Sequence, residues 1–321
     1  TRLVFRLLDQ PGTGGERDLD VWCGRGFLSN AAVRLAAASA VGRDTELASA
    51  STLCRWENQA DRATAWRLHE VLVEQFIASY RRAPKRLILD FDATDDAVHG
   101  QQVGRFFHGY YDHYCFLPLY VFCGKQLLVS YLRPSKIDGA KHAWAILSLL
   151  VQRLRQTWPK VRILLRADSG FCRWKMLRWC ERNAVDYLVG IARNDRLNAQ
   201  AQPFLSAAER IFQNTGRKQR RFHVMYYAAH SWDRRRRIIV KAEHTAKGSN
   251  PRYLVTNLKA EAQYLYDRLY CARGEMENRI KEQQLGLFAD RTSAHYWWAN
   301  QFRLLLSSAA YVLVEALSSR G

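Results

Sequence analysis

The first part of the chain, residues 1–84, carries the periodicity of helices. Apolar residues recur every three or four positions and so share one helical face: Leu68, Val71, Leu72, Phe76 and Ile77. Pro84 follows, and proline cannot continue a helix. We therefore predict a helical N-terminal segment over residues 1–84.

Short apolar runs alternate with helical patterns in the next hundred residues. Runs at 85–92, 114–122 and 126–132 predict three strands, the last two forming a hairpin around Gly124. A helix over 138–158, a strand over 161–168, a helix over 173–183 and a strand over 186–192 follow. Strands that arrive after a hairpin by helical crossovers predict a mixed α/β sheet with helices on its faces.

Residues 197–260 have a different rhythm. Three strands are predicted there, over 220–230, 234–244 and 251–258. Beyond this β-rich insertion, 260–291 reads as a long helical segment and 300–318 as a strongly apolar helix. We divide the chain into the N-terminal segment 1–84, which we expect to bind DNA, a catalytic domain from 85–196 and 261–321, and the insertion 197–260.

The chain is strongly basic. Its 321 residues contain 49 Lys and Arg against 30 Asp and Glu, a net charge of +19. Residues 171–260 hold 19 of the basic and 6 of the acidic residues, including the run Arg234, Arg235, Arg236 and Arg237. Such an excess favours a nucleic-acid partner, although an arginine-rich solvated surface is an alternative. Trp232 and Tyr253 supply rings that can stack on bases, with core packing as their alternative.

Composition and cysteine spacing exclude several other classes. Seven cysteines without a CxxC pair predict a reduced, cytoplasmic protein without a zinc site. The longest apolar run, 304–317, is shorter than the roughly 20 residues a membrane span needs, so no membrane partner is expected. The sequence does not begin with Met, which favours an internal or truncated fragment.

Two aspartates end predicted strands. Asp92 and Asp168 would lie in one crevice if their strands are adjacent, because ligands collect at the carboxyl ends of strands. Paired carboxylates suit Mg²⁺, and two such ions can clamp the oxygens of a phosphoryl transfer. For either residue alone, a turn or helix cap is the favoured alternative. Asp90 shares the face of Asp92 but lies deeper, whereas Asp95, Asp96 and His99 are expected to be turn residues.

A third acid is expected on the helix after the insertion. Tyr270, Arg273 and Glu277 stand at i, i+3 and i+7, on one helical face, and Lys281 is four residues further. An ordinary solvated face with weak ion pairs has the same spacing. The spacing alone favours that alternative.

Longer motifs carry a resemblance that covers nearly the whole chain. They are DFDATDDAVHGQQ, PLYVFCGKQLLVSYLRPS, RADSGF, GSNPRYLVTNL and YCARGEMENRIKEQQLGLFADRTS. Together they resemble bacterial insertion-sequence transposases of the thirteen-eighty group, which are similar to the wider insertion-sequence-four superfamily. The resemblance implies a ribonuclease-H-like catalytic domain with a β-rich insertion. It also implies that Asp92, Asp168 and Glu277 hold two Mg²⁺ ions, for which Mn²⁺ can substitute.

The resemblance also implies roles for the helix that carries Glu277. The superfamily signature Tyr, Arg, Glu, Lys is matched by Tyr270, Arg273 and Glu277, but position 284 is Gln. Lys281, one turn earlier, could replace that lysine beside the scissile phosphate. Some superfamily members cut through a hairpin and extrude a base, for which Trp232 or Tyr253 would be the stacking ring.

The implied function is a DNA transposase that nicks transposon ends and joins them to target DNA. Its partners would be terminal inverted repeats, target DNA and a second copy in a paired-end homodimer. Two alternatives stay open: a ribonuclease-H-like nuclease without strand transfer, and a truncated DNA-binding remnant without activity.

Overall fold

The computed structural model describes residues 50–318, and these fall into two compact units. The terminal unit combines residues 50–82, 93–138 and 276–318, and the central unit combines 83–92 and 139–275. Residues 1–49 of the predicted helical segment lie outside the described residues. No described helix is both long and apolar enough to cross a membrane.

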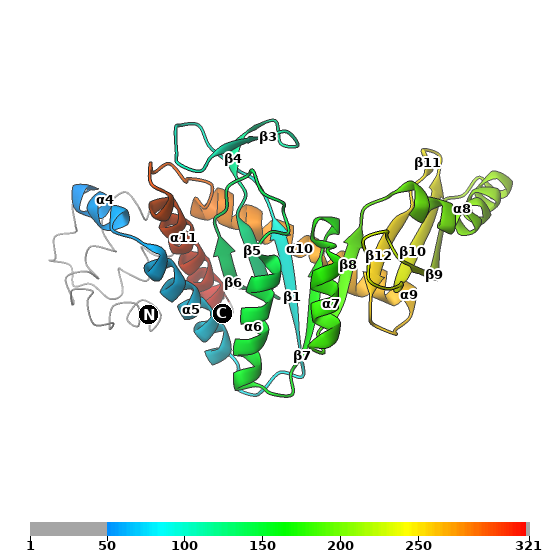
Figure 1. Ribbon diagram of the computed structural model, residues 1–321, viewed down its shortest axis with the longest axis horizontal. Coiled ribbons are helices and arrows are strands. Elements are labelled where there is room, and N and C mark those ends of the chain that lie inside the picture. The colour runs from blue at the N-terminus through cyan, green and yellow to red at the C-terminus, as the bar shows by residue number, and fades with distance from the viewer. Residues whose placement is uncertain (1–49, 319–321) are drawn as a thin grey trace. The chain divides into compact units, whose positions relative to one another are not determined.

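A mixed sheet forms the centre of the central unit (Figure 1). Strands β1 (Arg86–Ala93), β7 (Arg162–Ala167) and β8 (Asp186–Ile191) are parallel neighbours, as their buried apolar runs predict. The helices α6 (Ala143–Thr157) and α7 (Trp174–Arg182) precede β7 and β8 in the chain. This part of the unit confirms the predicted order of strand, helix, strand, helix and strand.

The sheet continues into the insertion with antiparallel strands. β12 (Arg252–Thr256) pairs with β8, and β10 (Arg236–Thr245) pairs with β12, β9 (Gln219–Tyr227) and β11 (Gly248–Ser249). Three of these match the predicted strands, so the insertion extends the central sheet.

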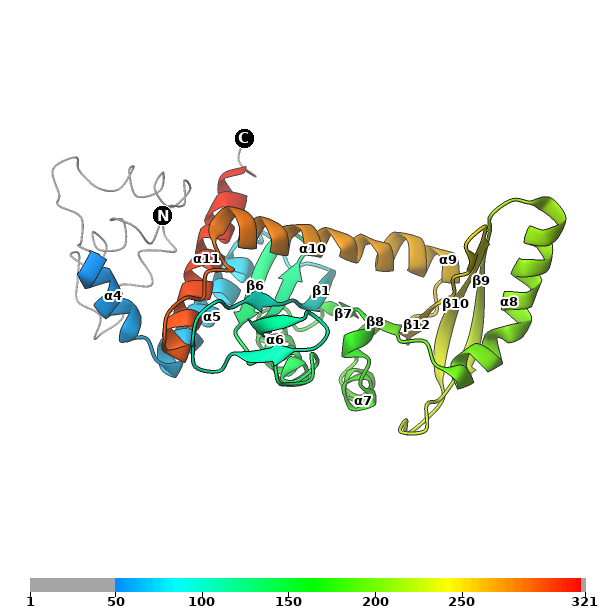
Figure 2. The ribbon, with the colours of Figure 1, turned by 90° about the horizontal axis from the view of Figure 1, so that it is seen from above.

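The insertion begins with a long helix that the periodicity does not predict. α8 (Asp195–Thr215) starts at Asn194, whose side chain accepts a hydrogen bond from the Leu197 amide, and ends at Gly216 with φ of 64°. It lies beside β9 and β10, where Phe204 stacks on His223 with ring centroids 4.2 Å apart (Figure 2). The insertion is therefore α/β and not β-rich alone.

The segment after the insertion is helical but irregular. It runs through α9 (Ala262–Tyr264), the π-helix η2 (Leu265–Tyr270), the 3₁₀ turn η3 (Cys271–Arg273), α10 (Gly274–Lys281) and the π-helix η4 (Glu282–Gly286). Leu265 and Leu269 pack on Leu164, Leu188 and Leu254 of the sheet. Single π-helical turns inside helices are often found at functional sites, so this segment is a candidate part of a functional site.

The terminal unit is built around α11 (Trp297–Ser318). Apolar residues of α5 (Arg62–Ala78) pack on α11, and Arg303 of α11 forms a bidentate ion pair with Glu57 of α4 (Ala50–Asn58). The Gln301 side chain of α11 accepts a hydrogen bond from the Leu132 amide at 2.7 Å and donates one to the Ser130 carbonyl.

A hairpin and a three-stranded sheet complete the terminal unit. β5 (Leu119–Cys123) and β6 (Gln126–Tyr131) form the predicted hairpin around Gly124. β2 (Asp96–Ala97), β4 (His113–Phe116) and β3 (Phe106–His108) form the small sheet. The predicted single strand over 114–122 is therefore two strands, with Pro118, which has no N–H to donate, between them.

Candidate active site

Asp92 and Asp168 lie side by side at the carboxyl ends of neighbouring strands. The register of β1 and β7 pairs Phe91 with Ala167, so the two aspartates occupy the next pair of positions. Parallel strands lie about 4.8 Å apart, which brings the two carboxylates to the same edge and face of the sheet. Both residues are half-buried. The adjacency on which the predicted site depends is therefore present in the central unit.

A buried ion pair lies two residues deeper on the same face. Asp90 and Arg166 are register partners, and the Arg166 guanidinium binds both carboxylate oxygens of Asp90, with Nη2 to Oδ2 at 2.7 Å. Its Nη1 also donates to the carbonyl oxygen of Leu269, in the π-helix η2. The Arg166 side chain of β7 thus links β1 to η2, two residues before the two aspartates along their strands.

Tyr270 ends the π-helix and is held close to the same edge. A Cβ placed on Gly190 of β8 would lie 2.8 Å from the Tyr270 hydroxyl oxygen and 2.8 Å from the Ser169 amide nitrogen. Burial raises the pKa of Tyr270; among its charged neighbours, Arg273 lowers that pKa and Asp168 raises it. The absent side chain of Gly190 therefore makes room for Tyr270 beside Asp168.

Arg273 reaches the first aspartate. Its Nη1 lies 3.3 Å from Oδ2 of Asp92, and both side chains are 13% exposed. The 3₁₀ turn η3 follows the π-helix η2, so the helical rotation between Tyr270 and Arg273 is not that of a regular α-helix. The structure nevertheless brings both residues, predicted as neighbours on one face, to the two aspartates.

The carboxylates suit a hard divalent cation. Asp168 caps the turn η1 (Ser169–Phe171) by accepting a hydrogen bond from the Gly170 amide at 2.9 Å. It therefore also has the capping role that was the alternative to metal binding. Asp92 and Asp168 together still offer the oxygen ligands that Mg²⁺ and Mn²⁺ prefer. Within residues 50–318, no group of three or more His, Cys, Asp or Glu residues is arranged to hold a metal ion.

The other two residues predicted on this helix belong to the terminal unit. Glu277 and Lys281 are exposed on α10. Gln284, which stands where the superfamily signature has Lys, donates a hydrogen bond to the Asp95 carbonyl at 3.1 Å.

Comparison with known proteins identifies the family. Residues 29–320 match the family described as "Transposase DDE domain group 1". The chain belongs to this DDE transposase family. No curated protein matches the sequence.

One solved structure is similar to this DDE domain at 12% sequence identity and a TM-score of 0.44. It is titled "Cryo-EM structure of piggyBac transposase synaptic complex with hairpin DNA (SNHP)". The match covers 78% of this chain and 51% of that chain, so the DDE domain spans about half the length of that transposase.

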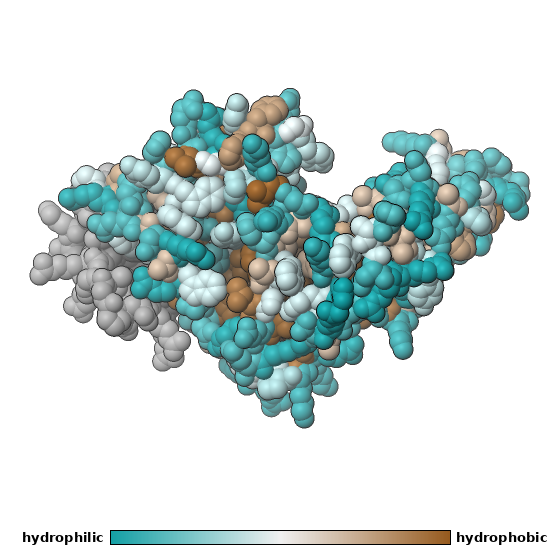
Figure 3. All heavy atoms as spheres, viewed as in Figure 1, coloured by the Kyte–Doolittle hydropathy of each residue, from teal (hydrophilic) through white to brown (hydrophobic). Residues whose placement is uncertain are grey.

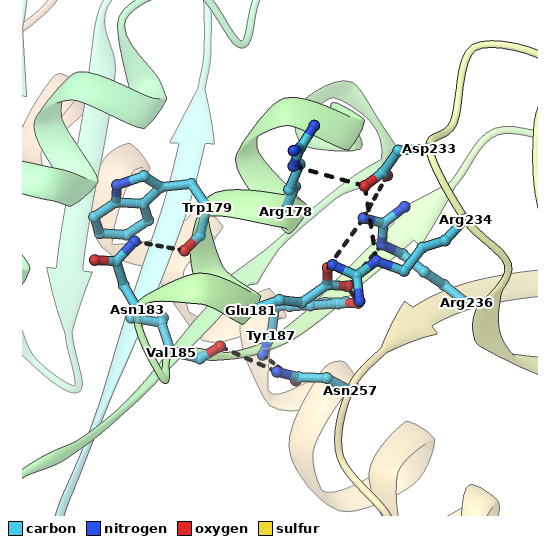
Figure 4. Close-up of polar contacts among 10 residues, drawn as sticks. All are labelled: Arg178, Trp179, Glu181, Asn183, Val185, Tyr187, Asp233, Arg234, Arg236 and Asn257. Atoms are coloured by element: carbon cyan, nitrogen blue, oxygen red, sulfur yellow. Dashed lines mark hydrogen bonds and ion pairs between the residues drawn. The ribbon is translucent and has the colours of Figure 1, made fainter.

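The arginines of the run in this DDE domain form ion pairs and hydrogen bonds within the chain (Figure 4). Glu181 of α7 binds Arg236 through both carboxylate oxygens, at 2.7 and 3.1 Å, and binds Arg234 at 2.9 Å. Arg236, 3% exposed, also binds Asp233. The Tyr187 hydroxyl donates to Glu181, which joins the insertion to β8.

The two remaining arginines of the run bind carbonyl oxygens. Arg235 binds that of Tyr226, and Arg237 binds those of Leu258 and Ala260. Arg234 and Arg236 therefore link the insertion to α7, whereas Arg235 and Arg237 bind backbone within the insertion, which the count of charges could not reveal. The DNA-binding role of Arg234 and Arg235, whose side chains are exposed, stays a prediction.

The two rings proposed for base stacking differ in their surroundings within the insertion. Tyr253 is 2% exposed, and its hydroxyl donates to Asn198 at 2.8 Å, so it packs in the core. Trp232 is half-buried; its ring lies at 75° to that of Tyr227, with centroids 5.7 Å apart, and the Arg236 guanidinium is 5.4 Å from its ring centroid. Core packing, the alternative for both, describes Tyr253, whereas the stacking role of Trp232 stays a prediction.

Sequence reasoning missed Arg166 and Gly190. A signal for Arg166 was present, because Asp90 and Arg166 each stand two positions before a site aspartate and interrupt an apolar run with opposite charges. The role of Gly190 had no such signal, since it depends on the approach of Tyr270 from a segment eighty residues away in the chain.

Proposed function

We propose that the chain is the catalytic part of a DNA transposase of the thirteen-eighty insertion-sequence group. It would cut transposon ends and join them to target DNA by two-metal phosphoryl transfer. The observation that carries the proposal is the in-register placement of Asp92 and Asp168 at the ends of β1 and β7, beside Tyr270 and Arg273. Family membership supports DNA as the substrate.

In this proposal Asp92, Asp168 and Glu277 hold two Mg²⁺ ions, or Mn²⁺ in their place. Bound there, the ions would supply Lewis-acid stabilisation of the attacking and leaving oxygens. Glu277 follows Arg273 by one helical turn, which supports its choice as the third carboxylate.

In the proposed function, Arg273 binds Asp92 in the absence of DNA and a phosphate group in its presence. Without substrate, its guanidinium balances the charge of Asp92 at 3.3 Å. The same guanidinium would donate to a phosphate oxygen of bound DNA, which its planar donors fit well. Tyr270 would donate a hydrogen bond from its hydroxyl group to the same phosphate, and its raised pKa keeps the hydroxyl protonated at neutral pH. Lys281 would add a positive charge one turn beyond Glu277.

The deciding experiment uses labelled duplexes that carry the element's terminal inverted repeats, with Mg²⁺ or Mn²⁺, and scores nicking and strand joining separately. Asp92→Asn and Asp168→Asn keep the side-chain shape but remove a ligand charge. We expect cleavage to fall by about a thousandfold or more while affinity for the duplex changes by less than about threefold.

Asp186→Asn is the matched control. Asp186 is the first residue of β8, so it lies at the amino ends of the parallel strands, opposite to the two aspartates. There it pairs with exposed Arg162. Its replacement should leave nicking and joining unchanged. Equal loss of binding and cleavage in the Asp92 and Asp168 variants would contradict the proposed catalytic role.

The same assay separates the alternative functions. Nicking without strand joining would favour a ribonuclease-H-like nuclease. Binding without either reaction would favour a DNA-binding remnant. Sedimentation of the complex with paired ends tests the proposed homodimer.

A further inference from the structure

The β3–β4 hairpin of the terminal unit displays aromatic rings on its surface. Phe107 is 54% exposed, Tyr114 is 47% exposed and Tyr110, in the connecting turn, is 85% exposed. In Figure 3 the tan colour of apolar residues reaches the surface over β3 and β4, near the top of the view. Exposed rings gathered in this way are a mark of a binding surface.

The rings share one face of the hairpin with a cation. Phe107 and Tyr114 are directly opposite each other in the register of β3 and β4, with ring centroids 5.7 Å apart at 74°. The Arg105 guanidinium lies over the Tyr114 ring, 4.3 Å from its centroid. We call Arg105, Phe107 and Tyr114 the aromatic platform. Its composition, flat rings beside a guanidinium, is that of surfaces that stack unpaired bases.

Close packing and hydrogen bonds fix the backbone of the hairpin that carries the aromatic platform. Gly104 adopts φ of +88°, and a Cβ there would lie 2.7 Å from the Trp297 ring, so the chain passes closely over α11. The Val103 amide donates to the His295 carbonyl at 3.1 Å, and the Ser135 hydroxyl donates to the Phe106 carbonyl at 2.8 Å. Rings held on a fixed support lose little conformational freedom when they bind.

The charged residues of the hairpin indicate which kind of ligand the aromatic platform binds. Arg105 lies on the face of the aromatic platform, and Lys136 lies 5.6 Å from the Phe106 ring centroid on the hairpin's other face. Asp112 is the single carboxylate among residues 105–114. A polyanion would be attracted to this hairpin and to a chain of net charge +19, which favours DNA as the ligand of the platform.

We propose that the aromatic platform binds unpaired bases of DNA by stacking. This rests on the proposed function, because it requires DNA as the partner, and it assigns the stacking role to the hairpin in place of Trp232 and Tyr253. Each stacked base stabilises a complex enough to change affinity by about tenfold, and such stacking depends little on base identity.

The test measures the affinity of the full chain for three fluorescently labelled DNAs by anisotropy: a single strand, a duplex with a central bubble and a fully paired duplex. In Phe107→Ala/Tyr114→Ala, we expect affinity for the first two to fall by about tenfold or more and affinity for the paired duplex by less than about threefold. Phe107→Tyr and Tyr114→Phe keep the rings and should keep the affinity.

Tyr226→Ala is the matched control. Tyr226 lies on β9 and is 57% exposed, so the variant removes a comparably exposed ring from outside the hairpin. It should bind all three DNAs as the original chain does. Thermal unfolding of each variant checks that the hairpin substitutions leave the fold intact.

Two outcomes would overturn the inference. Unchanged affinity of the double variant for all three DNAs would exclude stacking at the platform. A change from dimer to monomer in light scattering, with DNA affinity unchanged, would assign the surface to a second copy of the chain. The proposed function fails separately, when the original chain binds no DNA and cleaves none.

Discussion

Two clusters of charge in the central unit use arginine in opposite ways. At the end of β1 and β7, one buried guanidinium, Arg166, holds Asp90 and the carbonyl of Leu269, and so places the segment that carries Tyr270 and Arg273. In the insertion, four consecutive arginines divide their contacts among Glu181, Asp233 and backbone carbonyls. The comparison teaches that an isolated charge in an apolar strand can matter more to a site than a conspicuous basic run.

The largest expected effect comes from Arg166→Ala. The substitution removes the bidentate guanidinium partner of the buried Asp90 carboxylate, so we expect the free energy of unfolding to fall by about 3–5 kcal/mol in urea denaturation. Arg162→Ala is the control on the same strand, because the Arg162–Asp186 pair is exposed and contributes about 0–1 kcal/mol. Equal losses in the two variants would remove the distinction drawn for Arg166.

A buried aspartate without an arginine sharpens the comparison. Asp96 is buried in the terminal unit, and burial raises its pKa to about 7 despite a hydrogen bond from Thr292. Because the folded chain then binds the proton more tightly than the unfolded chain, stability falls as pH rises from about 4 to about 7, by up to about 4 kcal/mol.

Denaturation at a series of pH values measures this slope. Asp96→Asn should flatten it and raise stability at pH 8, because the amide stays neutral. A slope that persists in the variant would assign the pH dependence to other groups.

Gly190→Ala tests the approach of Tyr270 to the aspartates. The new Cβ would lie 2.8 Å from the Tyr270 hydroxyl oxygen, so Tyr270 must move. We expect a loss of about 1–3 kcal/mol in stability from overpacking, and a lower cleavage rate at unchanged DNA affinity. Gly139→Ala, where a Cβ meets nothing within 4 Å, is the control. A fully active Gly190→Ala enzyme would show that the position of Tyr270 is not critical.

The smallest effect is expected from the basic run itself. Arg234→Gln/Arg235→Gln should reduce the slope of log affinity against log salt by at most about 2, since at most two phosphate contacts are lost. Arg236→Gln should instead lower the melting temperature, because Arg236 is buried against Glu181 and Asp233. A larger loss of slope in Arg236→Gln than in the double variant would mean that Arg236, and not Arg234 and Arg235, contacts the DNA.

Most individual elements could be predicted from local pattern. The runs at 85–92, 161–168 and 186–192 became β1, β7 and β8, because buried parallel strands read as continuous apolar stretches. α8 was missed because Pro203 and scattered polar residues weaken its periodicity, and its stability comes from packing on β9 and β10. The irregular turns between Ala262 and Gly286 likewise have no simple sequence signal.

By itself, the sequence determined the strands that end in Asp92 and Asp168, the helical character around Glu277 and the resemblance to transposases. Only the tertiary structure decided that Phe91 pairs with Ala167, that Arg166 binds the Leu269 carbonyl, and that the arginine run binds Glu181. Local periodicity depends on neighbouring residues and can be read along the chain. Register, burial and the partner of a charge depend on segments distant in sequence, which only folding brings together.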